Sequence, residues 1–135
     1  MDLSNAENAM ELTPVIIAHV ATAAAALVFG AVTLGLRKGT AAHRLFGRMW
    51  VALMATTALV SFGIRTSGHF SWIHLLSVAT LAGLAGSIYA VLRGNIKAHR
   101  RGMVSAYIGL AVAGAFTLLP GRRLGYALWH AVGIV

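Results

Sequence analysis

The sequence predicts an all-α integral membrane protein, a four-transmembrane-helix bundle built from two parallel helical-hairpin repeats, with a short C-terminal interfacial segment. Apolar residues make up 59% of the 135 residues and charged residues only 10%, whereas soluble domains are roughly 25% charged. The apolar residues gather in four long runs, and one half of the chain can be aligned with the other. Residues 1–135 are therefore expected to form a single membrane domain, since this length leaves little room for a separate soluble one.

The first two spans are expected at about residues 12–36 and 45–64. No charged side chain occurs from residue 12 to residue 36, and a hydrocarbon core about 30 Å thick needs about 20 residues of helix. The second run is free of charge only from residue 49 to residue 64. Arg48 and Arg65 at its two ends are therefore expected to extend toward the headgroups.

The other two spans are expected at about residues 70–92 and 102–120. Pro120 and Gly121 end the last run, because proline cannot easily continue a helix. Residues 124–135 are too few to cross a bilayer. We expect this tail to lie at the interface, with Tyr126 and Trp129 as aromatic anchors.

The basic residues predict an orientation in the membrane. With the N-terminus outside, the cytoplasmic side holds eight of them and the outer side three, which follows the positive-inside rule. A multi-pass protein of the cytoplasmic (inner) membrane with its N-terminus outside is therefore expected. This topology also explains the net charge of +8 without nucleic acid as a partner. The eight are Arg37, Lys38, Arg44, Arg48, Arg93, Lys97, Arg100 and Arg101, and the three are Arg65, Arg122 and Arg123.

The two halves of the chain share a pattern of histidines. His43 and Arg44 align with His99 and Arg100 at an offset of 56 residues, and His19 aligns with His74 at an offset of 55. Each half contains two spans, so the halves enter the membrane in the same direction and equivalent residues share a depth. His19 and His74 are thus expected near the outer ends of their helices, and His43 and His99 near the inner ends.

Paired imidazoles at one depth suggest a haem site. Two histidines from facing helices can bind a haem iron axially, so the specific hypothesis is an electron-transfer protein with b-type haem bound by His19 and His74. His43 and His99 would bind a second haem or contact its propionates, together with Arg44 and Arg100. A structural alternative is open for both layers, because a histidine in a membrane can donate to a backbone carbonyl and hold helices together.

Other functions are favoured or excluded by composition. The chain has no cysteine, and its three acidic residues all lie within the first 11 positions, so thiolate chemistry and carboxylate pairs are excluded from the spans. No nucleophile motif is present; enzymatic activity is left open and not favoured. The contrasting hypothesis is a non-catalytic accessory or scaffolding subunit of a larger membrane complex, or a homo-oligomer. The bilayer itself is an expected partner, with anionic headgroups on the cytoplasmic side contacting Arg44 and Arg100.

A set of short motifs extends over nearly the whole chain. The motifs are Lys38-Gly39-Thr40, His43-Arg44, Gly47-Arg48, Trp50, Ile73-His74-Leu75-Leu76-Ser77, His99-Arg100, Met103, Tyr107, Gly109-Leu110 and Phe116-Thr117-Leu118-Leu119-Pro120-Gly121-Arg122. With these motifs the chain resembles a bacterial family of predicted membrane proteins, domain of unknown function 2306. The resemblance implies a four-helix membrane fold in a bacterium, with these His and Arg positions part of the family pattern, and it implies no activity.

Overall fold

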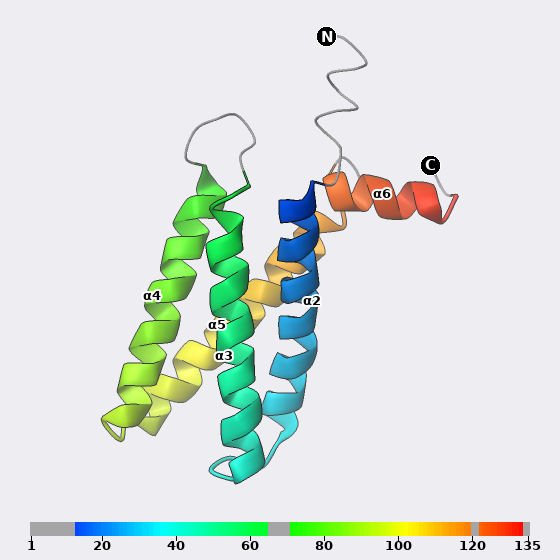
Figure 1. Ribbon diagram of the computed structural model, residues 1–135. Helices are drawn as coiled ribbons and strands as arrows, with labels where there is room; N and C mark the ends of the chain where they lie inside the picture. Colours follow the sequence, from blue (N-terminus) through cyan, green and yellow to red (C-terminus); the bar gives the residue numbers. More distant parts are fainter. Residues whose placement is uncertain (1–12, 65–70, 120–121, 134–135) are drawn as a thin grey trace.

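A computed structural model describes residues 13–64, 71–119 and 122–133, and over these residues the secondary structure consists of helices joined by turns, with no strand (Figure 1). The all-α expectation is confirmed. Residue 12, residues 65–70 and residues 120–121, which bound three of the expected spans, lie outside the described residues, as do the acidic side chains before residue 12. The five helices are α2 (Pro14–Gly35), α3 (Ala41–Ser61), α4 (Trp72–Leu92), α5 (Ile96–Thr117) and α6 (Arg123–Ala131).

Helices α3 and α5 begin several residues before the expected spans at 45 and 102. Their starts are set by N-cap side chains: Thr40 Oγ1 accepts from the His43 N–H at 3.2 Å, and Asn95 Oδ1 accepts from the Ala98 N–H at 3.0 Å. Such caps satisfy backbone donors that a helix start leaves free. The basic residues that delimit the hydrophobic runs therefore lie within the first turns of helices.

The long helices form two hairpins that pack side by side. Helix α2 pairs with α3 and α4 pairs with α5, while α3 also contacts α4 and α2 contacts α5. In Figure 1, α3 lies between α2 and α4, and α5 crosses behind. The turns α2–α3 and α4–α5 lie at one end of the bundle, which we call the hairpin end (residues 36–40 and 93–95). The opposite end, where α6 projects from the bundle, is the α6 end.

Both turns at the hairpin end depend on a glycine. Gly39 has φ of 81° and Gly94 has φ of 78°, a left-handed conformation that costs little only without a Cβ. In each turn the glycine lies just before the N-cap of the next helix. The two halves of the chain therefore reverse direction by the same local device.

The buried core is small and lies mainly between α2, α3 and α4. It consists of Ala26, Trp50, Met54 and Leu84, and α5 adds only partly buried side chains. Two helices, α2 and α4, are long and apolar enough to cross a membrane, yet only 17% of the most apolar window of each is buried. The core helix of a soluble protein would be mostly buried, so these apolar surfaces face another medium or another protein.

Candidate functional site

The hairpin end carries His43 and His99 in equivalent settings. His43 Nδ1 donates to the Thr33 carbonyl at 3.3 Å, and His99 Nδ1 donates to the Ser87 carbonyl at 3.0 Å. In both cases the histidine is in the first turn of the second helix of a hairpin, and the acceptor is a buried residue near the end of the first. Since a carbonyl can only accept, Nδ1 carries the proton in each ring.

A glycine lies at the helix crossing beside each of these bonds, and only at Gly102 does the close approach exclude a larger residue. A Cβ added at Gly47 would lie 3.7 Å from Thr33 Cγ2, and one added at Gly102 would collide with Ser87 Oγ. Small residues at such crossings allow backbones to approach within reach of interhelical hydrogen bonds. The hydroxyl residue, the histidine and the glycine thus form one packing unit, which occurs once in each hairpin.

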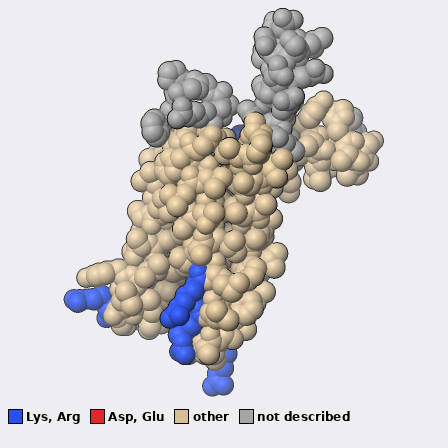
Figure 2. Space-filling model, in the orientation of Figure 1, with Lys and Arg blue, Asp and Glu red and all other residues tan. Residues whose placement is uncertain are grey.

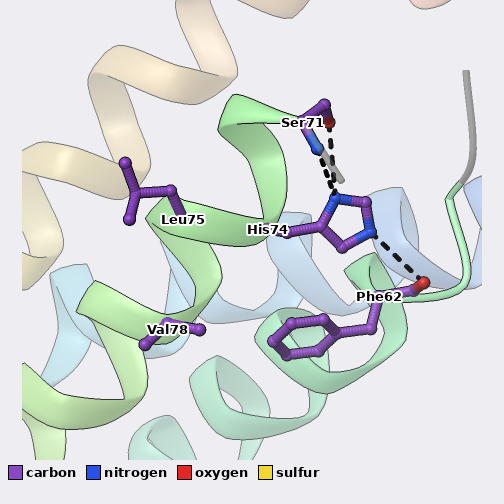
Figure 3. A pocket seen from close by; sticks show the side chains of 5 residues that line it. All are labelled: Phe62, Ser71, His74, Leu75 and Val78. Atoms are coloured by element: carbon purple, nitrogen blue, oxygen red, sulfur yellow. Dashed lines mark hydrogen bonds between the residues drawn. The ribbon is translucent and has the colours of Figure 1, made fainter. Parts of the chain in front are cut away.

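The α6 end holds the other two repeat histidines, and their settings differ. His19 on α2 donates from Nδ1 to the Thr57 carbonyl at 3.0 Å. His74 on α4 uses both ring nitrogens: Nδ1 accepts from the Ser71 N–H at 3.1 Å, and Nε2 donates to the Phe62 carbonyl at 3.4 Å (Figure 3). His19 therefore has a proton on Nδ1, whereas His74 has one on Nε2.

His19 and His74 bond to different sides of the same helix, α3. Their acceptors, Thr57 and Phe62, are both on α3 and are five residues apart in sequence. Five residues correspond to a rotation of about 140° around a helix. Each imidazole is thus held against its own side of α3, and neither hydrogen bond joins one ring to the other.

A pair of buried serines lies next to His74. The hydroxyls of Ser61 on α3 and Ser77 on α4 are in direct contact, and each also lies within hydrogen-bond distance of a carbonyl of its own helix: Ala58 at 2.6 Å and Ile73 at 2.8 Å. Since each hydroxyl has one proton, one serine donates to the other while the second donates to its carbonyl. This contact joins the two hairpins at the α6 end. Neither serine has a role predicted from the sequence; the available signal was a hydroxyl within an apolar run, at the level of His19 and His74.

A cavity of about 270 Å³ opens beside the His74 ring (Figure 3). The Phe62 and His74 rings are 5.6 Å apart, tilted by 43°. Because both His74 nitrogens are bonded to the backbone at Ser71 and Phe62, the ring presents mainly its carbon face to this space. The cavity is therefore a mostly apolar recess, lined by Phe62, Ser71, His74, Leu75 and Val78.

Two aromatic residues, Trp50 and Tyr107, pack at the centre of the bundle. Neither of them has a functional role predicted from the sequence. Trp50 on α3 is 3% exposed, and Tyr107 on α5 donates from Oη to the Leu27 carbonyl at 3.2 Å. Both rings pack against Gly30, where an added Cβ would lie 2.5 Å from the Tyr107 ring and 2.6 Å from Trp50 Nε1. Trp50 Nε1 itself has no hydrogen-bond partner among the described residues.

The basic residues gather at the hairpin end (Figure 2). Arg44 and Arg100 are both exposed there, and Arg44 Nη1 donates to the Gly39 carbonyl at 2.9 Å. Their contact with lipid headgroups or propionates stays a prediction. Arg65 and His69 lie outside the described residues, and no group of three or more His, Cys, Asp or Glu side chains within the described ranges is placed to bind a metal ion.

The sequence model of one protein family, described as "Predicted membrane protein (DUF2306)", matches residues 16–130. The chain belongs to this family. No curated protein and no solved structure gives a significant match.

Membership in the DUF2306 family explains why so much apolar surface is exposed. The family description places its members in a membrane and assigns no activity, and the chain has two helices suited to cross one. Large apolar side chains such as Val28 on α2 and Leu76 on α4 are more than half exposed. In a bilayer these side chains contact lipid or neighbouring helices, so their exposure in the isolated chain costs nothing there.

Proposed function

We propose that this protein is a non-catalytic accessory or scaffolding subunit of a larger membrane assembly. The observation that carries the proposal is the open face of the α4–α5 hairpin. Helix α5 buries none of its described residues, and a Cβ added at Gly83, Gly86 or Gly109 would have no atom within 4 Å. By contrast, Gly30 in the first hairpin is fully packed.

The open face suits a helix of another protein better than lipid alone. Small residues let a neighbouring backbone approach closely and form many dispersion contacts, which is the main source of helix association in membranes. Ala82 and Gly86 on α4 are one helical turn apart, and both are exposed. In the first hairpin the residues at the same repeat positions, Ala26 and Gly30, are buried by helices α3 and α5.

We further propose that all four long helices cross the inner membrane of a bacterium as two parallel hairpin repeats, with the N-terminus outside. The matched Nδ1–carbonyl bonds of His43 and His99 support the repeat. The basic residues at the hairpin end support the orientation, since cytoplasmic loops are enriched in Lys and Arg. On this arrangement the α6 end faces outward, and α6 lies at the outer interface. Its Trp129 is an aromatic anchor there, with Nε1 donating to the Leu118 carbonyl at 3.1 Å.

The accessory role is tested with two variants that carry the same substitution. Ala82→Ile adds bulk to the open face, and Ala24→Ile adds the same bulk at a similar distance from the hairpin end on the exposed side of α2. We expect the protein extracted from native membranes in mild detergent to migrate as a complex. Ala82→Ile should lose the complex, and Ala24→Ile should keep it. A monomer in the unmodified protein, or equal behaviour of the two variants, contradicts the proposal.

A second candidate function, b-type haem binding, is favoured by the tautomer of three histidines. His19, His43 and His99 each donate from Nδ1 to a carbonyl. The Nε2 atom of each ring therefore has a lone pair that can bind a metal ion. Metal-ligating histidines usually have this second bond, because it fixes the tautomer and the ring orientation. His74 does not fit the pattern, since its Nε2–H donates to Phe62. A haem between His19 and His74 would therefore require His74 to leave its present partners.

Absorption spectra of purified protein, oxidised and then reduced with dithionite after haem supplementation, test this second function. A b-type spectrum that is lost in His43→Ala and His99→Ala but kept in His74→Ala would assign haem to the hairpin end. The reverse result would assign it to His19 and His74. The absence of a Soret band in the unmodified protein would exclude haem binding under these conditions and leave the accessory role.

A further inference from the structure

The basic side chains of this protein have no carboxylate partner in most of the chain. All eleven Lys and Arg residues follow position 11, and no Asp or Glu does. A protein normally balances such clusters with nearby acidic side chains. No described residue therefore supplies an acidic side chain to the hairpin end.

Three of the basic residues at the hairpin end already have partners within the chain. Lys38 Nζ donates to the carbonyls of the α2 C-terminus, at distances of 2.6–3.2 Å. Arg44 donates to the Gly39 carbonyl, and the Arg93 guanidinium lies 5.9 Å from the centre of the Tyr89 ring. The side chains of the remaining five are exposed and have no hydrogen bond or ring contact with any described residue: Arg37, Arg48, Lys97, Arg100 and Arg101.

Four of these five are on α3 and α5, beside exposed apolar side chains. Arg48 is seven residues into α3, about 10 Å from its start, and its neighbours Leu45 and Met49 are 58% and 42% exposed. On α5, Lys97 follows Ile96, which is 60% exposed, and Arg100 and Arg101 lie one turn further on. Figure 2 shows the Lys and Arg side chains at this end of the bundle, next to surface without charge.

This combination of cations and apolar surface matches one kind of partner. A soluble polyanion such as RNA offers phosphates but no acyl chains to cover the apolar side chains. A phospholipid with a net negative charge offers both, with its phosphate at the boundary where long basic side chains extend. We propose that the hairpin end binds the headgroups of anionic phospholipids through Arg48, Lys97, Arg100 and Arg101.

The test measures lipid preference with the full chain. The protein is purified in detergent and given equal amounts of phosphatidylglycerol and phosphatidylcholine, and the lipids that stay bound are counted by native mass spectrometry. We expect phosphatidylglycerol to be preferred. Loss of one basic residue near an anionic headgroup should lower this preference about fivefold. Arg101→Gln should therefore lower it by that factor, and the triple variant Arg48→Gln/Arg100→Gln/Arg101→Gln more than tenfold.

Two control variants distinguish binding at this site from a general effect of net charge. Arg122→Gln removes one exposed arginine at the α6 end and should leave the preference unchanged, and Arg101→Lys keeps the charge and should retain most of it. Circular dichroism and thermal unfolding in phosphatidylcholine show whether each variant is folded. If the triple variant is unfolded, the comparison of Arg101→Gln with the unmodified protein decides the test. The proposal is overturned if Arg101→Gln and Arg122→Gln act alike. It is also overturned if inorganic phosphate or an RNA oligonucleotide displaces phosphatidylglycerol.

Discussion

The two hairpins share a sequence pattern but differ in how they are packed. In the first, Ala26 and Gly30 are covered by Trp50 of the same hairpin and Tyr107 of the other. In the second, the residues at the matching positions, 82 and 86, are exposed. The shared pattern therefore accounts for local features, such as the turn glycines and the bonds of His43 and His99. Burial, by contrast, depends on which helices are neighbours.

The largest expected effect concerns Gly30. An added methyl group would lie 2.5–2.6 Å from the Tyr107 ring and Trp50 Nε1, and overpacking of this kind costs about 1–3 kcal/mol. Gly30→Ala should therefore lower the unfolding temperature in detergent. Gly86→Ala has open space around the new methyl group and should leave stability unchanged or raise it slightly. Equal loss in both variants would mean that the two hairpins are packed alike.

The next effect concerns the contact between the hairpins. His74 is buried and bonds Ser71 within α4's first turn and Phe62 at the end of α3. His74→Ala leaves two backbone groups without these partners, for a loss of about 1–2 kcal/mol. His130→Ala is the control, because His130 is exposed on α6. Chemical unfolding in detergent measures both variants, and a His74 variant as stable as the control would show that the contact contributes little.

A smaller effect is expected at the helix crossing of the second hairpin. In Gly102→Ala the new methyl group meets Ser87 Oγ, which has to rotate away, at a cost of about 1 kcal/mol. Gly47→Ala places a methyl group at ordinary contact distance from Thr33 and should be nearly neutral. Adding Ser87→Ala to Gly102→Ala should restore part of the lost stability. No recovery in the double variant would exclude this collision as the cause.

The smallest loss of stability is expected for the His43 and His99 bonds, and it should be the same in both hairpins. His43→Ala and His99→Ala each remove one interhelical bond to a carbonyl, and such bonds in membrane proteins contribute about 0.6 kcal/mol on average. The two losses should be similar, and they should add in the double variant because the sites share no partner. The unfolding free energy of each variant measures these losses. Losses that differ severalfold between His43→Ala and His99→Ala would show that the two bonds are not equivalent.

The sequence predicted those parts of the structure that depend on local chemistry. The helical class followed from the long apolar runs. Helices α3 and α5 begin before the expected spans, because the span bounds were set by charge while Thr40 and Asn95 set the helix starts through their caps. A membrane span and the helix that contains it need not begin at the same residue, since a helix can continue into the headgroup region.

Contacts between helices were predicted less well. The alignment of the two halves treats His19 and His74 as equivalent, yet His19 bonds within its own hairpin and His74 bonds to the other hairpin. The Ser61–Ser77 contact and the packing of Tyr107 on Gly30 depend on helices that meet only after the hairpins associate. A periodic pattern in one helix shows which residues share a face and does not show which helix covers that face.

The bond from Tyr107 to Leu27 joins residues 80 positions apart, and this separation sets an order of events during biosynthesis. At 5–20 residues per second, a ribosome adds those 80 residues in roughly 4–16 s. For that time the nascent first hairpin has Gly30 covered by Trp50 but not yet by Tyr107. Helix α5 thus covers a surface of α2 that was made much earlier, and a stalled chain that ends before α5 would expose that surface.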